Sequence, residues 1–159
     1  MNNFFSPDLK SKNIFEIDYA SLQKNGIRTL FFDLEQTLTD QVWLEPSLKL
    51  QEFFKDLKSK GFDLYVMTNQ RKSVSLERFI SYLDAKIVYF LFKPFPWFLQ
   101  HFIANDLKIP SQQVALIGDQ LFVDVLLSKI LGCFAVWVEP VGPAWGLYDW
   151  LLRPWEKEI

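Results

Sequence analysis

Five short runs of apolar residues alternate with segments of helical periodicity along most of the chain. From about residue 28 onward these runs are TLFFDL, FDLYVMT, KIVYFLF, QVALIG and CFAVWV, and each has the length of a buried strand. Strands that are apolar throughout, each followed by a helix, indicate a parallel sheet, because right-handed crossovers place helices on both of its faces. We therefore expect an α/β fold with a doubly wound, five-stranded parallel sheet.

The segments between the runs have the spacing of one-sided helices. Apolar side chains recur at or near i, i+3, i+4 and i+7 in residues 50–57, 76–83 and 99–107. Residues 121–131 are apolar nearly all round, which predicts a deeply buried helix. Residues 147–152 predict a last short helix, which Pro154 should end or interrupt.

Composition limits the classes of function. The chain has 159 residues, half of them hydrophobic, with no repeat and no Ser/Gly-rich linker, so we expect a single domain over residues 1–159. Cys133 is the one cysteine and His101 the one histidine; we expect the first in the core and the second on a helix surface. Together they cannot build the usual zinc sites, so any metal would be held by oxygen.

Charge and hydropathy bear on partners and location. A single cysteine fits a reducing compartment, so we expect a cytoplasmic protein. The net charge of −2 gives no general attraction for nucleic acid. Charged residues interrupt the apolar runs, and the start MNNFFSPDLK lacks a basic leader. We expect neither a membrane-spanning helix nor a signal peptide.

Polar side chains stand at the carboxyl ends of four consecutive runs. In chain order they are Asp33, then Thr68 and Asn69, then Lys93, then Gly118 and Asp119, with Asp124 five residues further on. Parallel strands bring these ends to one edge, which is where ligands bind in such sheets. Carboxylates suit a divalent metal ion, a hydroxyl and an amide suit an anion, and a lysine neutralises that anion. The set predicts phosphoryl transfer, with Mg²⁺ held between Asp33 and Asp119 and with Thr68, Asn69 and Lys93 binding phosphate.

In order and content these residues resemble the four motifs of the haloacid dehalogenase superfamily of phosphatases. The matching motifs are Asp33-x-Glu35-x-Thr37, Thr68, Lys93 and Gly118-Asp119-x4-Asp124. Three further stretches, NIFEIDYASLQKNGIRTLFFDLEQTL, FKPFPW and LIGDQLFVDV, are similar to the subclass IIIA family called YqeG, whose relatives include phosphatidylglycerophosphate phosphatases.

The resemblance implies a role for each motif residue. Asp33 would be the nucleophile that forms an aspartyl-phosphate, and Thr68 and Lys93 would hold the transferred group. Asp33, Asp119 and the backbone carbonyl of Glu35 would hold Mg²⁺, and Asp124 would support these ligands from behind.

Glu35 departs from the superfamily pattern. The superfamily normally has Asp at this place, where it protonates the leaving group and later activates water. The extra methylene of Glu35 moves the carboxyl group by about 1 Å, and a misplacement of that size can cost ~10²-fold in rate. We expect Glu35 to be a working but suboptimal acid and base.

Simpler structural roles stay open for most of these side chains. Asp33 could cap a helix, Thr68 and Asn69 could cap the next helix, Lys93 could be a solvated loop charge, and Asp124 could tie its helix to a loop. Several aromatic residues could form an apolar rim that meets a lipid surface, although we expect most of them in the core: Phe95, Trp97, Phe98, Trp145, Trp150 and Trp155.

The spacing of the motifs leaves no room for a cap domain, since one helix and one strand fill each interval from Asp33 to Thr68 and from Thr68 to Lys93. An uncapped site can admit a phosphate carried on something large, such as a lipid headgroup in a membrane. The resemblance makes phosphatidylglycerophosphate the leading substrate, met at the membrane periphery.

Two rival functions stand beside the enzyme. One is a catalytically weak or inactive interaction module of the same fold, with Glu35 as the sign of decay. The other is a receiver-type signalling domain, whose phosphorylated Asp follows the third strand. This chain offers Lys93 there, so the order of the motifs argues against a receiver.

Overall fold

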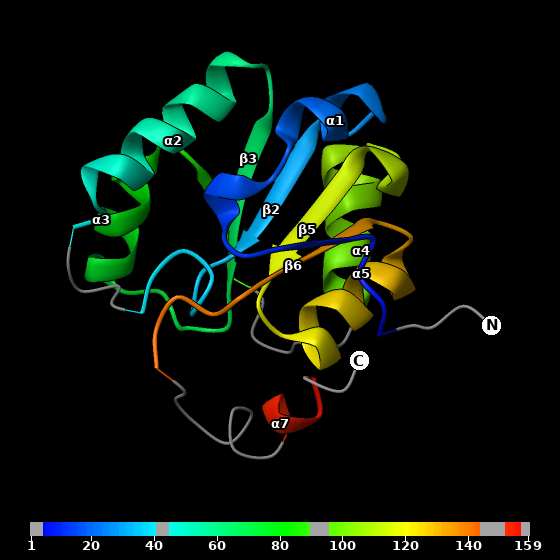
Figure 1. Ribbon diagram of the computed structural model, residues 1–159. Helices are drawn as coiled ribbons and strands as arrows, with labels where there is room; N and C mark the ends of the chain where they lie inside the picture. The colour runs from blue at the N-terminus through cyan, green and yellow to red at the C-terminus, as the bar shows by residue number, and fades with distance from the viewer. Residues whose placement is uncertain (1–4, 41–44, 90–95, 144–151, 157–159) are drawn as a thin grey trace.

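A computed structural model describes residues 5–40, 45–89, 96–143 and 152–156. In this part of the chain, six parallel strands form one sheet in the order β1-β6-β5-β2-β3-β4 (Figure 1). The strands are β1 (Leu9–Ser11), β2 (Thr29–Asp33), β3 (Asp63–Thr68), β4 (Lys86–Tyr89), β5 (Val114–Gly118) and β6 (Phe134–Val138). The predicted α/β class is confirmed.

The predicted strand count was one too low. The additional strand, β1, has the three residues LKS and pairs with β6 at the edge of the sheet. An edge strand that is short and partly polar carries no apolar run that periodicity could detect.

Helices occupy the four predicted segments that the structure describes. The longer ones are α2 (Leu48–Ser59) and α3 (Val74–Leu83). The other two segments each join an α-helical part to a π-helical part: α4 (Trp97–His101) with η2 (Phe102–Leu107), and η4 (Leu121–Val125) with α5 (Leu126–Leu131). Outside the predictions are α1 (Tyr19–Lys24) and two 3₁₀ turns, η1 (Ile14–Glu16) and η3 (Ser111–Gln113).

The last helix differs from the prediction. Helix α7 (Arg153–Glu156) contains Pro154 in its first turn, although Pro154 was expected to end a helix. A proline is tolerated in the first turn because the N–H that it lacks would have no partner within the helix. Most of the predicted segment 147–152 lies outside the described residues.

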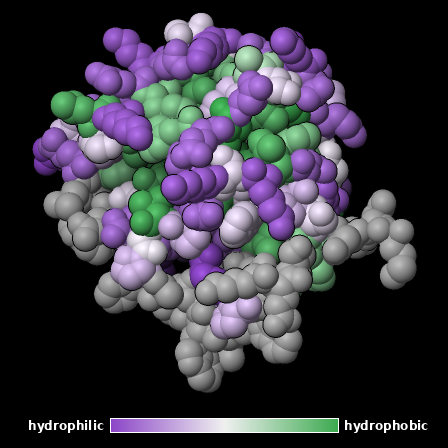
Figure 2. Space-filling model, viewed as in Figure 1, coloured by the Kyte–Doolittle hydropathy of each residue, from purple (hydrophilic) through white to green (hydrophobic). Residues whose placement is uncertain are grey.

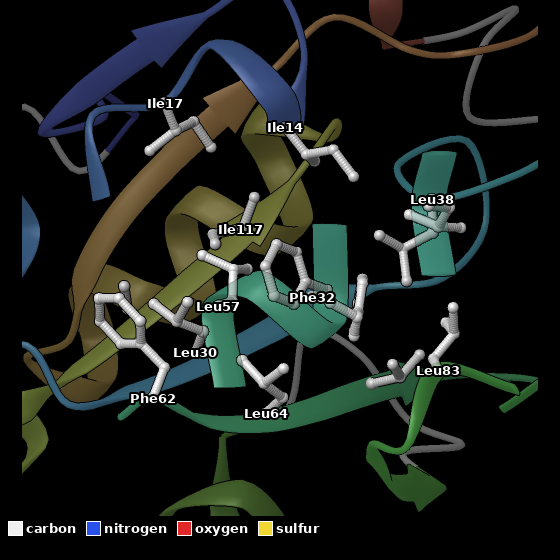
Figure 3. Close-up of a cluster of buried hydrophobic side chains, with 14 of the residues drawn as sticks. Ile14, Ile17, Leu30, Phe32, Leu38, Leu57, Phe62, Leu64, Leu83 and Ile117 are labelled. Atoms are coloured by element: carbon white, nitrogen blue, oxygen red, sulfur yellow. The ribbon is translucent and has the colours of Figure 1, made fainter. Parts of the chain in front are cut away.

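Alternating side chains along each strand feed two cores. Leu30 and Phe32 of β2 join the core beneath α2 and α3, whereas Phe31 joins the core beneath α4 and α5, and Figure 1 shows these helix pairs on opposite sides of the sheet. In the first core, side chains from strands and helices interdigitate, among them Leu30, Leu57, Leu64 and Ile117 (Figure 3). On the face seen in Figure 2, the coloured residues mix hydrophilic and hydrophobic side chains.

The connections between strands match the expectation of an uncapped domain. In the described residues, α2 is the helix between β2 and β3, and α3 is the helix between β3 and β4. No described helix has both the length and the mean hydropathy that crossing a membrane requires.

The strand order places a switch point beside β2. After β4 the chain returns to pair β5 with the other side of β2, so successive strands extend from β2 first in one direction and then in the other. Phe32 is in register with Ile117 of β5, and Asp33 is in register with Met67 of β3. Ligands in such sheets bind beyond the carboxyl ends of strands at the point of reversal. Asp33 and Asp119 both stand there.

Candidate active site

Three buried carboxylates meet at the switch point. Asp33 is the last residue of β2, Asp119 directly follows β5, and Asp124 lies one turn into η4. Each offers a carboxylate oxygen, and the three oxygens lie within 4.8 Å of one another. All three residues are buried. Carboxylates up to 91 residues apart in sequence therefore form one cluster.

Gly118 is needed for the close approach of Asp124. A Cβ atom at position 118 would lie 2.3 Å from Asp124 Oδ2 and 2.6 Å from its Cβ, distances that no real side chain tolerates. Asp124 Oδ2 also accepts a hydrogen bond from the backbone N–H of Gln120 at 3.2 Å. Asp124 thus ties its helix to the loop after β5, and the same carboxylate belongs to the cluster.

Asp119 is held from three sides. Its Oδ1 accepts a hydrogen bond from Thr37 Oγ1 at 3.2 Å, and its Oδ2 lies 2.5 Å from Arg153 Nη2. The indole N–H of Trp137 donates to its backbone carbonyl at 2.8 Å. Burial raises the pKa of Asp119 to about 7, and the charge of Asp124 adds to the rise, while Arg153 and Thr37 oppose it.

The acid/base candidate and a phosphate-binding candidate contact each other. Thr68 Oγ1 donates a hydrogen bond to Glu35 Oε1 at 2.5 Å, and the same hydroxyl accepts one from the Gln70 N–H at 2.9 Å. Thr68 is buried and Glu35 is half-buried. The Glu35 side chain is therefore directed toward the end of β3.

The loop after β2 contains a non-glycine residue in the left-handed region. Gln36 has φ 63°, a conformation that few side chains adopt freely. Its backbone carbonyl accepts a hydrogen bond from the Val141 N–H at 2.7 Å, and its side-chain Oε1 accepts one from the Gly142 N–H at 2.9 Å. The segment after β6 thereby fixes the turn that carries Glu35 and Thr37.

The remaining predicted phosphate-binding residues, Asn69 and Lys93, are not placed in the carboxylate cluster by the described part of the structure. Asn69 is exposed, and Lys93 lies outside the described residues. The capping role left open for Thr68 and Asn69 is wrong, because α3 is capped by Ser73, whose hydroxyl accepts a hydrogen bond from the Leu76 N–H at 3.2 Å. Ser73 is nearer to the first apolar position of the helix, so it satisfies the free N–H groups instead.

Predictions on the other reactive and aromatic residues were partly right. Cys133 is buried in the core, and burial raises the pKa of its thiol to about 12. His101 is exposed on α4. Trp97 and Phe98 are 70% and 53% exposed, so these two residues do not belong to the core. The other four aromatic side chains of the predicted rim lie outside those described: Phe95, Trp145, Trp150 and Trp155.

Sequence reasoning missed two groups that act on the cluster. Arg153 reaches Asp119 from α7, and Gln36 with Gly142 fixes the turn after β2. Arg153 had no motif to mark it, since no spacing rule relates a residue after the last strand to the end of β5. Thr37 did have a signal, as the third position of the first motif.

The donor set fits a hard divalent cation. The carboxylates of Asp33, Asp119 and Asp124 offer oxygen alone, and oxygen is the ligand that Mg²⁺ prefers. Burial raises the pKa of Asp119, and repulsion from the negative charge of Asp124 adds to the rise. A divalent ion among them would offset that repulsion.

Comparisons with known proteins agree with the motifs. The family described as "Mitochondrial PGP phosphatase" matches residues 96–141, less than half of the chain. The Bacillus subtilis (strain 168) protein named "Probable phosphatase YqeG" is 27% identical over 161 residues, covering 100% of this chain and 91% of that protein.

Solved structures share the fold. The cobalt-bound deoxy-D-mannose-octulosonate 8-phosphate phosphatase YrbI of Haemophilus influenzae is similar with a TM-score of 0.53 at 22% identity, over 70% of this chain and 68% of that one. An uncharacterized protein of Listeria monocytogenes serotype 4b gives a TM-score of 0.57 at 19% identity, over 80% and 88% of the two chains. At these identities the likeness establishes the fold alone.

Proposed function

We infer that this chain is a phosphatase of the haloacid dehalogenase superfamily, similar to YqeG along its whole length, and we propose that it hydrolyses phosphomonoesters through an aspartyl-phosphate on Asp33 with Mg²⁺ as cofactor. One observation carries the proposal: Asp33, Asp119 and Asp124 converge at the switch point of the sheet. Their order along the chain is that of the superfamily's motifs.

The proposed reaction has two displacements at phosphorus. A carboxylate oxygen of Asp33 attacks the phosphorus, the bond from phosphorus to the substrate oxygen breaks, and Glu35 gives its proton to that oxygen. Water then attacks the phosphorus, Glu35 takes the proton from this water, and the bond from phosphorus to Asp33 breaks. Inorganic phosphate leaves, and both carboxyl groups return to their starting states.

The other site residues would hold charge in place. Asp33, Asp119 and the Glu35 backbone carbonyl would bind Mg²⁺, which supplies positive charge beside the phosphate oxygens. Asp124 is as close to the cluster as the other two carboxylates, so it would either support the ligands or bind the ion itself. Thr68, Asn69 and Lys93 are the proposed phosphate-binding residues.

The contact between Glu35 and Thr68 makes the role of Glu35 testable. We expect Glu35→Gln to lower turnover by about 10²-fold or more, because the amide can neither give nor take the proton. Glu35→Asp should turn over faster than the wild type, because the shorter side chain restores the reach typical of the superfamily. Phosphate release from p-nitrophenyl phosphate measures all three proteins, and equal rates would refute a role for Glu35 in proton transfer.

For the substrate we propose a phosphomonoester on a membrane lipid, phosphatidylglycerophosphate in particular, met by a cytoplasmic protein at the membrane periphery. The match to "Mitochondrial PGP phosphatase" supports this choice. Exposed apolar side chains support it too. Leu48, Val74, Trp97 and Phe98 lie where helices begin after strands, Val141 lies shortly after β6, and Leu152 directly precedes α7. Tryptophan favours the boundary between apolar and wet surroundings.

Substrate preference tests this assignment. With Mg²⁺, the purified protein should release phosphate from phosphatidylglycerophosphate in vesicles far faster than from nucleotides or sugar phosphates. Asp33→Asn serves as the blank for contaminating phosphatases. A preference for the soluble esters would eliminate the lipid assignment and leave the phosphatase assignment standing.

A further inference from the structure

Arg153 brings a positive charge into the carboxylate cluster from the far end of the chain. It is the first residue of α7, and its side chain is 13% exposed while that of Asp119 is fully buried. Its Nη2 lies 2.5 Å from Asp119 Oδ2, and its Nη1 donates a hydrogen bond to the Asp119 backbone carbonyl at 3.2 Å. One guanidinium group therefore holds both the carboxylate and the backbone of the same residue. Figure 1 shows α7 beyond the edge of the sheet where β2 and β5 end.

The two contacts from Arg153 fix the orientation of Asp119. A guanidinium group presents several N–H donors in a fixed plane, so two contacts to one residue fix the orientation of its carboxylate. Thr37 holds the other carboxylate oxygen, which leaves Asp119 with little rotational freedom. An oriented carboxylate loses less entropy when it binds an ion than a freely rotating one does.

The charges of the site favour keeping Arg153 beside Asp119 when a divalent ion binds. Asp33, Asp119 and Asp124 together carry three negative charges when ionised, and a divalent ion would offset two of them. The charge of Arg153 balances the third. The guanidinium also holds the Asp119 backbone carbonyl, so an ion bound through Oδ1 would not have to displace it.

Two residues shortly after β6, Val141 and Gly142, contact the same site. Val141 and Gly142 donate backbone hydrogen bonds to Gln36, which sits between Glu35 and Thr37. The chain after β6 thus contacts the loop after β2 through residues 141–142 and the loop after β5 through Arg153.

We propose that Arg153 is a positioning residue of the metal site, which orients Asp119 for the divalent ion. The inference rests on the proposed function, because it assumes that Asp119 binds the ion. Residues that orient metal ligands typically contribute 10- to 100-fold, as an order of magnitude, to metal affinity.

Calorimetric titration of the purified full chain with Mg²⁺ tests this role without any turnover. We expect Arg153→Gln to weaken Mg²⁺ binding by about 10-fold and Arg153→Lys to restore part of that loss. The matched control is Lys129→Gln, which removes another ion pair between distant parts of the chain, Lys129 with Asp8 at 2.5 Å, away from the carboxylate cluster. Lys129→Gln should bind Mg²⁺ like the wild type. Thermal melts identify any variant that fails to fold, in which case Arg153→Lys alone decides.

The outcomes separate the positioning role of Arg153 from the proposed metal site. Unchanged Mg²⁺ affinity in Arg153→Gln would overturn the positioning role while the metal site stands. Tighter binding would overturn it as well, by showing that the guanidinium competes with the ion for Asp119. If the wild type bound no Mg²⁺ at all, both this inference and the proposed metal site would fall.

Discussion

The carboxyl edge and the amino edge of the sheet place their charges in opposite ways. At the carboxyl edge the described residues bury Asp33, Asp119 and Asp124 with Thr37 and Thr68. At the amino edge, where α2 and α3 end, the ion pairs Lys58–Asp84 and Lys60–Asp56 are half or more exposed. Exposed pairs contribute about 0–1 kcal/mol to stability, whereas burying carboxylates together costs free energy. The buried carboxylates therefore favour a ligand-binding role for the carboxyl edge, as proposed above, and the stability of the fold comes from elsewhere.

Replacing Asp33, the proposed nucleophile, should show the difference between the two edges of the sheet most clearly. We expect Asp33→Asn to lower turnover by about 10³-fold or more, because an amide cannot form the aspartyl-phosphate. Its thermal midpoint should stay level or rise, since one of three crowded negative charges is gone. Asp56→Asn at the amino edge is the matched control and should leave turnover unchanged. Normal turnover in Asp33→Asn would contradict the proposed chemistry.

A substitution in the core should have the opposite pattern, with a loss of stability and little change in turnover. Phe54 of α2 is fully buried, with its ring 5.1 Å from that of Phe32 between centroids. We expect Phe54→Ala to lower the free energy of unfolding by about 3–5 kcal/mol, through lost burial and the cavity that remains. Urea denaturation measures that loss, and turnover of the folded protein should hardly change. A large loss of turnover without a loss of stability would contradict the separation.

Two glycines allow a matched test of geometry. We expect Gly118→Ala to lower turnover about 10²-fold, because the new Cβ would overlap the Asp124 carboxylate and displace it from the cluster. Gly132 has φ 70° and no atom within 4 Å of a built Cβ. Gly132→Ala should therefore cost about 1 kcal/mol in stability through backbone strain and leave turnover intact. Equal effects in the two variants would show that the close approach is unimportant.

The smallest expected effect is a pH dependence of the metal-free protein. The pKa of Asp119 is raised from 3.8 to about 7 by burial, and Asp124 adds to the shift. Between these two pH values the folded chain holds a proton that the unfolded chain has lost, so this group makes stability fall as pH rises. Asp33 and Asp124 face Asp119 with like charge, and Arg153 faces it with opposite charge.

Thermal melts in EDTA from pH 5 to pH 7 check this sign. The midpoint of the wild type should fall over that range more than the midpoint of Asp119→Asn does. Parallel curves for the two proteins would show that Asp119 is already ionised in the folded chain.

The fold followed from the sequence because apolar runs and helical spacing are local signals. Both cores form where the predicted strands and helices meet, while β1 escaped because three partly polar residues carry no pattern. Of the candidate site, the carboxylates of Asp33 and Asp119 could be placed together, since parallel strands bring their carboxyl ends to one edge.

The rest of the site depends on contacts that no spacing rule encodes. Arg153 and Gly142 reach the site through the path of the chain after β6, and the closeness of Asp124 to Asp33 and Asp119 depends on the missing side chain of Gly118. The sequence alone could not decide whether Trp97 is buried or exposed, because the same apolar residues occur on core faces and at exposed helix starts; the side chain is exposed.

A crystal structure of the protein with Mg²⁺ and beryllium fluoride tests the central claim most directly. Beryllium fluoride should be bound to an Asp33 carboxylate oxygen, with one Mg²⁺ at about 2.1 Å from oxygens of both Asp33 and Asp119. If the carboxylates stayed too far apart to share an ion, or if the ion bound elsewhere and Asp33 carried no adduct, the account would be contradicted. The chain would then be an interaction module that keeps the phosphatase fold.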